Sequence, residues 1–267
     1  MTQTIFRIRR YRPGQQETWW QDFTIETHPG MTILEGLQQI REKQDASLSW
    51  RHSCRMGVCG SCGMVMNGQP GLACNTQIHA VKDDLVRLEA LWNFPVAKDL
   101  VSDLTSMFDR HTAIGPYLRR DHDAARPRSE LKQSPAELDD YLQFTSCIKC
   151  GVCMAACPTL ASDAGFLGPM PLTAAHRYNS DSRDAGFAQR KETMAQHHGV
   201  THCHYAAECS RSCPKGVDPA RAIQLMKRDL VADMLGVRRN QLAQPVATQE
   251  PVIREELTAP AFTVADK

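Results

Sequence analysis

Apolar and polar residues alternate along residues 4–10 and 19–25, a pattern typical of two half-buried strands. An Asn-Gly pair at 67–68 follows another short apolar run and predicts a hairpin turn, and residues 85–88 are typical of a further strand. Between these segments, a capping box at 32–35 begins a run of apolar residues at helical spacing. This first part of the chain therefore predicts a small α+β domain.

Helical periodicity replaces the strand pattern from about residue 103. Residues 134–137 combine a serine N-cap, a proline at the first helical position and a capping glutamate. Asp218 and Pro219 begin another helix, with apolar residues at helical spacing as far as Leu230. We therefore expect an α+β domain over 1–103, an all-α domain over 104–240 and a flexible C-terminal tail over 241–267.

Composition excludes several classes of protein. The 267 residues carry 31 Lys and Arg against 30 Asp and Glu, so the formal charge of +1 gives no basis for binding nucleic acid or anionic lipid through bulk charge. The apolar fraction of 42% is sufficient for folded cores, yet no apolar run approaches the roughly 18 residues of a membrane span. We therefore expect a folded chain that does not itself cross a bilayer.

Eleven cysteines carry the chemical signal of this sequence. They form three groups, at 54–74, 147–157 and 203–213, and an odd number leaves one thiol outside any disulfide framework. Arg9 and Arg10 are followed by polar residues rather than by the apolar stretch of an export signal, so we expect the thiols to be reduced. Clustered reduced thiols indicate metal or redox chemistry.

The first group has the cysteine spacing of plant-type ferredoxins, which hold a [2Fe–2S] cluster. Its predicted ligands are Cys54, Cys59, Cys62 and Cys74. Gly57, Gly60, Ser61 and Gly63 permit the tight turns that direct thiolates inward and main-chain N–H groups toward sulfur. A structural zinc site is the alternative, and the glycine-rich spacer favours iron–sulfur.

The second and third groups have the pattern of a bacterial dicluster ferredoxin, in which the last cysteine of each run binds the other cluster. Both runs end in Cys-Pro, and Ala206 takes the place of one cysteine in the second run. Exchange of the last cysteines assigns Cys147, Cys150, Cys153 and Cys213 to a [4Fe–4S] cluster. The other cluster retains Cys157, Cys203 and Cys209.

Three thiolates with a methyl group at the fourth corner imply the iron-deficient [3Fe–4S] cluster. Loss of an iron and a thiolate changes the cluster charge, and a relatively high reduction potential suits an acceptor such as a quinone. Two alternatives stay open: water could fill the corner beside Ala206, or zinc could bind through His202, Cys203 and His204. In the zinc case, the Cys-Pro end of both runs would be a coincidence.

Four segments together resemble the iron–sulfur subunit of succinate dehydrogenase and fumarate reductase, the succinate:quinone oxidoreductases of the tricarboxylic acid cycle and the respiratory chain (complex II). They are the cysteine loop at 54–62, Gly-Leu-Ala-Cys at 71–74, residues 175–184 and residues 213–219, within a resemblance that covers residues 1–235. The family implies an N-terminal β-grasp plant-type ferredoxin domain followed by an all-α bacterial-ferredoxin-like domain. It also implies a peripheral membrane location, on the cytoplasmic side of a bacterial inner membrane or on the mitochondrial matrix face.

By resemblance, electrons pass between FAD in a flavoprotein subunit, the three clusters in the order [2Fe–2S], [4Fe–4S], [3Fe–4S], and quinone at membrane-anchor subunits that can hold haem b. The chain itself would carry no dicarboxylate chemistry, and its sequence has no hydride-transfer or hydrolase constellation. Asp181 and Asp184 are expected to be solvated acids in a loop or at a helix start.

The family places residues after the third-cluster cysteines near quinone, and here they are Pro158, Thr159 and His204. The tryptophan of ubiquinone-reactive members is absent from the three residues that follow Thr159. Gln224 and Lys227 lie one helical turn apart and match positions near menaquinone in fumarate reductases. The pattern favours menaquinone, with a solvated helix face as the alternative for Gln224 and Lys227 and a capping role for His204.

Two rival functions stay open at this point. A soluble relay subunit of a thiol-dependent fumarate reductase or of a heterodisulfide-reductase-like complex would share the ferredoxin runs. Those relatives typically add a long cysteine-rich segment, whereas this chain has no cysteine after Cys213. A zinc-stabilised interaction protein without a redox role would be colourless and free of iron.

Overall fold

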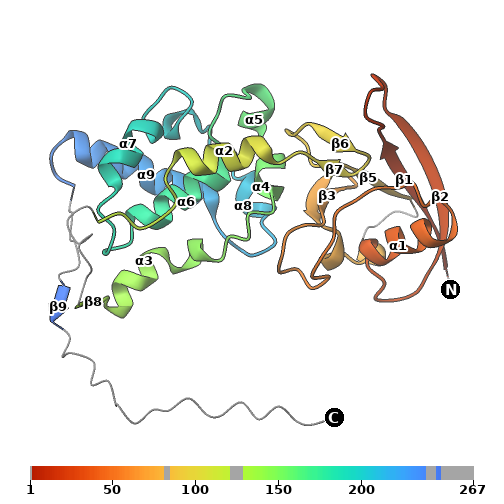
Figure 1. Ribbon diagram of the computed structural model, residues 1–267, viewed down its shortest axis with the longest axis horizontal. Helices are drawn as coiled ribbons and strands as arrows, with labels where there is room; N and C mark the ends of the chain where they lie inside the picture. The colour runs from red at the N-terminus through yellow and green to blue at the C-terminus, as the bar shows by residue number, and fades with distance from the viewer. Residues whose placement is uncertain (1, 81–84, 121–128, 239–244, 248–267) are drawn as a thin grey trace, which may run out of the picture.

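The computed structural model describes residues 2–80, 85–120, 129–238 and 245–247. A sheet with helix α1 (Ile33–Lys43) forms the N-terminal part, and helices from α2 (Thr105–Ala113) onward form the second part (Figure 1). The short helices α4 (Val152–Ala155) and α8 (Glu208–Arg211) pack against each other on the side of the helical part that is nearest the sheet (Figure 1). This is the α+β order that the sequence predicts, whereas the exact domain boundaries stay predictions.

The N-terminal part is a five-stranded mixed sheet with the strand order β2-β1-β5-β3-β4. β1 pairs parallel with β5, and the other neighbouring strands are antiparallel. The strands are β1 (Thr2–Arg10), β2 (Trp19–Thr27), β3 (Gly63–Met66), β4 (Gln69–Leu72) and β5 (Leu85–Glu89), beside a separate pair of β6 (Val96–Lys98) and β7 (Val101–Ser102). Asn67 and Gly68 both have positive φ in the β3–β4 turn, which confirms the predicted hairpin.

Helix α1 packs on the sheet through the apolar face that its sequence predicts. The predicted capping box is present: Thr32 accepts the Glu35 amide at 3.2 Å, and the Glu35 carboxylate accepts the Thr32 amide at 2.7 Å. The inward residues are Leu34, Leu37 and Ile40, and all three are buried. A Cβ on Gly36 would stand 2.6 Å from the Phe6 ring, so glycine at this position allows α1 to approach β1 closely.

The second part is mainly helical. In addition to α2, α4 and α8 it contains α3 (Pro135–Thr145), α5 (Pro158–Ser162), α6 (Pro169–Asn179), α7 (Phe187–Met194), α9 (Pro219–Met234) and the 3-10 turn η3 (Val200–His202). Two further 3-10 turns, η1 (Ala73–Asn75) and η2 (Ile78–Ala80), lie in the N-terminal part. Both predicted helix starts are confirmed, since the side chains of Ser134 and Asp218 accept main-chain N–H groups of the first turn. On α3 Tyr141 is buried, whereas Leu138 and Leu142 are exposed.

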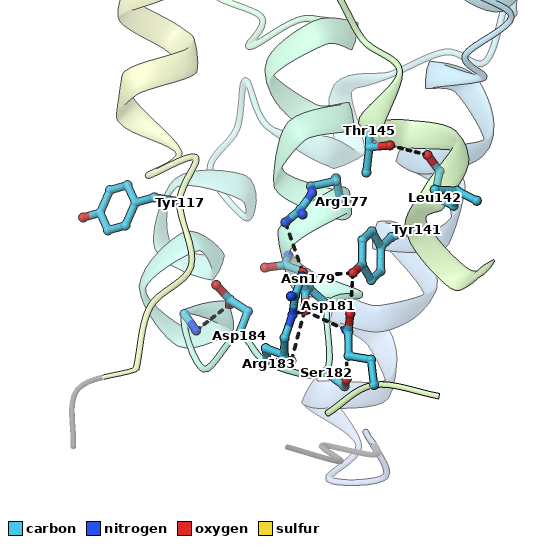
Figure 2. Close-up of polar contacts among 12 residues, drawn as sticks. Tyr117, Tyr141, Leu142, Thr145, Arg177, Asn179, Asp181, Ser182, Arg183 and Asp184 are labelled. Atoms are coloured by element: carbon cyan, nitrogen blue, oxygen red, sulfur yellow. Dashed lines mark hydrogen bonds and ion pairs between the residues drawn. The ribbon is translucent and has the colours of Figure 1, made fainter. Parts of the chain in front are cut away.

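Two aspartates differ from the sequence expectation. Asp181 and Asp184 are buried in the helical part rather than solvated, because each has arginine partners. Figure 2 shows Arg177 and Arg183 directed at Asp181, with ion-pair distances of 3.3 Å and 2.9 Å. Arg190 pairs with both oxygens of Asp184, at 2.6 Å and 2.8 Å. These carboxylates hold helices together, and the sequence could not show that the arginines would reach them.

A short strand pair joins distant parts of the helical region. β8 (Ser129–Leu131) pairs antiparallel with β9 (Pro245–Ala247), so the second part is not entirely helical. Apart from β9, the tail predicted over 241–267 lies outside the described residues. Within the described ranges, no helix combines the length and the apolar character that a bilayer crossing requires.

Candidate functional site

The first cysteine group occupies a loop before β3 and the turn after β4. Arg55, Gly57 and Gly60 adopt left-handed φ values of 58°, 71° and 75°, so the chain coils tightly between the cysteines. Main-chain N–H groups are directed at sulfur: those of Val58 and Cys59 reach the Sγ atom of Cys54 at 3.3 Å and 3.2 Å. The loop therefore has the inward thiols and N–H donors that favour an iron–sulfur cluster.

The four thiols of this loop differ in their surroundings. Hydrogen bonds from Ser61 and from the Cys54 and Ser61 main chain lower the pKa of Cys59 to about 6. Burial raises the pKa of Cys62 to about 12. Cys59 lies at the surface and Cys62 in the core, so the site spans the boundary between solvent and the interior.

The second site is a cavity in the helical part that all four predicted [4Fe–4S] ligands line. These are Cys147, Cys150, Cys153 and Cys213. Burial raises the pKa of Cys150 to about 11. Burial, and after it the charges of neighbouring thiols, raise the pKa of Cys153 well above its ordinary value. The buried thiols are therefore protonated unless a metal or cluster replaces their protons, so cluster binding releases protons here.

The third site is a second cavity, which carries Ala206 beside three cysteines. Its wall includes the predicted [3Fe–4S] ligands Cys157, Cys203 and Cys209. Burial raises the pKa of Cys209 to about 12, and the Tyr205 N–H lies 3.4 Å from the Sγ atom of Cys203. Tyr205 and Ala207 have left-handed φ values of 59° and 60°, so the loop turns sharply on both sides of Ala206. The cavity thus presents three thiols, with Ala206 at the position where the ferredoxin pattern has a fourth cysteine.

The three sites lie next to one another along the molecule. Gly60 of the first loop is in contact with Cys150 of the second site, and a Cβ on Gly60 would stand 2.6 Å from the Cys150 Cβ atom. Cys153 of the second site lies in α4, and Cys157 of the third site follows shortly after this helix ends. The charge of Cys209 of the third site also raises the pKa of Cys153. A chain of neighbouring sites therefore runs from the sheet into the helical part.

Asn93 links the sheet part to the helical part, and the sequence analysis did not identify it as a functional residue. Its side-chain amide donates to the main-chain oxygens of Met154, Ala155 and Cys157 at 2.9, 3.2 and 3.1 Å. Asn93 has a left-handed φ of 63°, a conformation that asparagine tolerates better than most residues. A lone asparagine between the strands β5 and β6 gives no sequence signal that it will cap the end of α4 next to two cysteine sites.

The residues expected near quinone lie around the third site. Pro158 and Thr159 line the same cavity as Cys157. His204 is exposed. The Lys227 ammonium donates to the Cys203 carbonyl at 2.9 Å, so this side chain is tied to the cysteine loop rather than only solvated.

Gln224 lies one helical turn before Lys227 on α9. Its amide nitrogen is buried and has no hydrogen-bond partner within the part of the chain that the structure describes. A buried donor without a partner costs free energy unless a ligand or water accepts its hydrogen bond.

The side chains present fit iron–sulfur clusters. Thiolates are the ligands that such clusters require, and the second and third cavities have walls of mainly apolar residues and cysteine. In the third cavity, no fourth cysteine lies among the lining residues. The donor set therefore matches two clusters with four thiolates each and one with three.

Comparisons with known proteins place both ferredoxin patterns in recognised families. A family described as "2Fe-2S iron-sulfur cluster binding domain" matches residues 5–109, and one described as "4Fe-4S dicluster domain" matches residues 139–214. The first match contains the loop before β3, and the second contains the two cysteine runs. The predicted order of a plant-type and then a bacterial-type ferredoxin domain is confirmed.

Relatives of nearly the same length align with most of this chain. The fumarate reductase iron-sulfur subunit of Mycobacterium tuberculosis is 42% identical over 85% of this chain and 92% of its own length, and that of Haemophilus influenzae is 41% identical over 85% and 94%. A chain of the Mycobacterium smegmatis Sdh1 complex in the apo form has a similar fold, with a TM-score of 0.73 at 24% identity over 87% of this chain and 96% of that chain.

Proposed function

The chain belongs to the family of fumarate reductase and succinate dehydrogenase iron–sulfur subunits, and we propose that it relays electrons between FAD of a flavoprotein subunit and a quinone at the membrane anchor. The proposed carriers are a [2Fe–2S] cluster in the first cysteine group, a [4Fe–4S] cluster and a [3Fe–4S] cluster. The last two are shared between the second and third groups, because Cys213 completes the [4Fe–4S] site and Cys157 completes the [3Fe–4S] site. When bound, each cluster supplies a one-electron redox centre. The chain's own residues hold the centres, shield them from water and fix their spacing.

The adjacency of the three sites is the observation that carries this proposal. The contact of Gly60 with Cys150 joins the first site to the second, and helix α4 joins the second to the third. A zinc-stabilised interaction protein has no need for three neighbouring thiol sites. The matches with this chain also cover 92% and 94% of the two fumarate reductase iron-sulfur subunits. This coverage favours a subunit of the same kind of complex over a relay subunit with an added cysteine-rich segment.

The first site provides a surface on which the flavoprotein subunit could dock. Met56 and Val58 in the cysteine loop are 73% and 55% exposed, so both present apolar surface to solvent close to the cysteines. Cys59 in the same loop is exposed as well. The loop therefore offers an apolar contact with a proposed ligand at its surface, as an electron entry point requires.

At the other end, we assign the surroundings of the third site to quinone. Pro158, Thr159, His204, Gln224 and Lys227 are the proposed neighbours, with menaquinone as the expected quinone. The unpartnered amide of Gln224 supports this, since a quinone oxygen would accept its hydrogen bond. The membrane-anchor subunits, and any haem b in them, would hold this end at the cytoplasmic face of the membrane.

The experiment uses the purified complex with its flavoprotein and anchor subunits. We expect succinate to reduce the clusters, as monitored by absorbance and electron paramagnetic resonance. We expect menadione, a naphthoquinone without a long tail, to reoxidise them. Without the flavoprotein, the chain should show no reduction by succinate. Clusters that stay oxidised in the intact complex, or that menadione leaves reduced, would contradict the relay.

A further inference from the structure

A cluster of potential metal ligands lies outside the cysteine cavities. Asp163, His198 and His202 bring one ligand atom each within 4.8 Å of one another. Oδ2 of Asp163 lies 2.6 Å from Nδ1 of His198 and 2.8 Å from Nε2 of His202. Asp163 directly follows α5, and His202 is the last residue of η3, so the cluster joins segments that are distant in sequence.

The loop around Asp163 is shaped to hold this arrangement. The Gly165 N–H donates to Oδ1 of Asp163 at 2.8 Å and orients the carboxylate, so that Oδ2 faces both imidazoles. A Cβ on Gly165 would stand 3.0 Å from Cε1 and Nδ1 of His198, so glycine leaves room for the ring. The Leu167 N–H donates to the His198 carbonyl at 2.9 Å and ties the two segments together. Such outer contacts are typical of oriented metal ligands.

We propose that Asp163, His198 and His202 form a binding site for a divalent transition-metal ion. Two imidazoles and a carboxylate suit Zn²⁺, Fe²⁺ or Ni²⁺ rather than Mg²⁺ or Ca²⁺, which prefer oxygen ligands alone. Bonds to Zn²⁺ of about 2.0–2.2 Å separate tetrahedral ligands by roughly 3.3 Å, so small outward rotations of the side chains would seat the ion. The His198 side chain is 51% exposed, which leaves the open side of the site accessible to water as a fourth ligand.

The bound ion would connect the two segments that carry the proposed third-cluster ligands. Helix α5 begins directly after Cys157 and is directly followed by Asp163, and His202 directly precedes Cys203. The site uses no cysteine, so it goes beyond the proposed relay and does not depend on it. Its role would be to hold the mouth of the third cavity in a fixed shape.

Zinc binding to the cluster-loaded complex tests the proposal. Zinc is titrated by equilibrium dialysis with elemental analysis, and a count of about nine cluster irons per chain before and after the titration verifies that the cysteines stay occupied. Zn²⁺ binds such ligands more tightly than Fe²⁺ does, so it would displace iron from this site. Wild-type protein should bind one additional Zn²⁺ per chain, and Asp163→Asn and His198→Gln should each weaken this binding at least about tenfold.

His197→Gln is the matched control, because His197 is adjacent in the chain but is not one of the three ligands. This variant should retain the zinc affinity of the wild type. Equal loss in His197→Gln and His198→Gln would reveal loose chelation by a histidine-rich segment and overturn the site. Absence of an additional Zn²⁺ in wild-type protein with full iron content would also overturn it, whether or not the electron relay is correct.

Discussion

Gly60 lies against Cys150 so closely that a Cβ on the glycine would stand 2.6 Å from the cysteine Cβ and 3.0 Å from its Cα. Main-chain atoms cannot move aside cheaply, so the contact fixes how the first cysteine loop meets the helical part. Asn93 reinforces the same junction through its hydrogen bonds to the end of α4. The position of the first two proposed clusters therefore depends on the absence of a side chain at residue 60.

Gly60→Ala is predicted to disturb this junction. The substitution adds both strain at φ 75° and a clash with Cys150, so we expect a lower thermal midpoint and weaker magnetic interaction between the first two clusters. Gly57→Ala is the control, because Gly57 has a similar φ of 71° but its nearest neighbour, in Asn75, is 3.8 Å away. Equal effects of the two variants would show that backbone strain alone, and not the contact, is responsible.

Arg10→Met is predicted to destabilise the sheet domain strongly. Arg10 is buried and pairs with Asp99 at 2.9 Å and with Asp45 at 2.7 Å. Its removal leaves the buried Asp99 carboxylate without its cation, which costs about 3–5 kcal/mol and lowers the thermal midpoint by roughly 6–20 °C. Calorimetry or circular dichroism of the cluster-loaded protein measures the change.

The exposed pair on the same strand provides the control. Arg7 pairs with Asp22 at 2.8 Å, but both side chains are in solvent, so Arg7→Met should leave the thermal midpoint nearly unchanged. A loss in Arg7→Met as large as in Arg10→Met would mean that burial of the Arg10 network is not the stabilising feature.

His176 predicts a pH-dependent stability in the helical part. Burial lowers the pKa of His176 to about 4. The charge of Asp229 raises this pKa, whereas the charges of Arg228 and Arg221 lower it. His176 therefore binds a proton below about pH 6.5 in the unfolded chain, but only below about pH 4 in the folded chain. The stabilising contribution is complete above pH 6.5 and is lost as the pH falls toward 4, by up to about 3 kcal/mol.

Thermal midpoints at pH 7.5 and pH 5 for the wild type and His176→Gln check this assignment. We expect the wild type to lose more stability than the variant between these two pH values, because the variant has no imidazole to protonate. An identical pH dependence in both proteins would assign the titration to another group. The His176 ring packs edge-on against the Phe144 ring, with 4.8 Å between the ring centroids. Loss of this contact should make the variant less stable at both pH values.

Ala206→Cys is predicted to change the third cluster. Ala206 lines the cavity with Cys157, Cys203 and Cys209, so a thiol here supplies a fourth ligand. We expect conversion toward [4Fe–4S], loss of the oxidised-state resonance signal and slower quinone reduction, since the cluster potential would fall. A variant with the wild-type signal and normal metal content would contradict the assignment of this corner.

Local sequence signals predicted most of the fold. The capping residues Thr32 and Ser134, the turn at Asn67 and the strand periodicity act over a few residues, so a single sequence is sufficient to reveal them. The cysteine spacings likewise predicted which thiols line one cavity, because the ferredoxin pattern itself implies the exchange of the last ligands.

Relationships between distant residues could not be predicted in this way. The burial of Asp184 depends on Arg190 reaching it from α7, and the bond of Lys227 to the Cys203 carbonyl depends on the packing of α9. The approach of Gly60 to Cys150 depends on how two separately patterned domains meet. None of these contacts leaves a local periodicity or spacing in the sequence.

Low-temperature electron paramagnetic resonance on the intact complex, air-oxidised and then succinate-reduced, tests the three-cluster relay most directly when iron and sulfide are counted on the same samples. Weakly held metal is first removed with a chelator. The account predicts about nine cluster irons per chain and a [3Fe–4S] signal in the oxidised state alone. A signal-free oxidised sample with about ten irons would contradict it, because water or another residue would then complete the cluster beside Ala206.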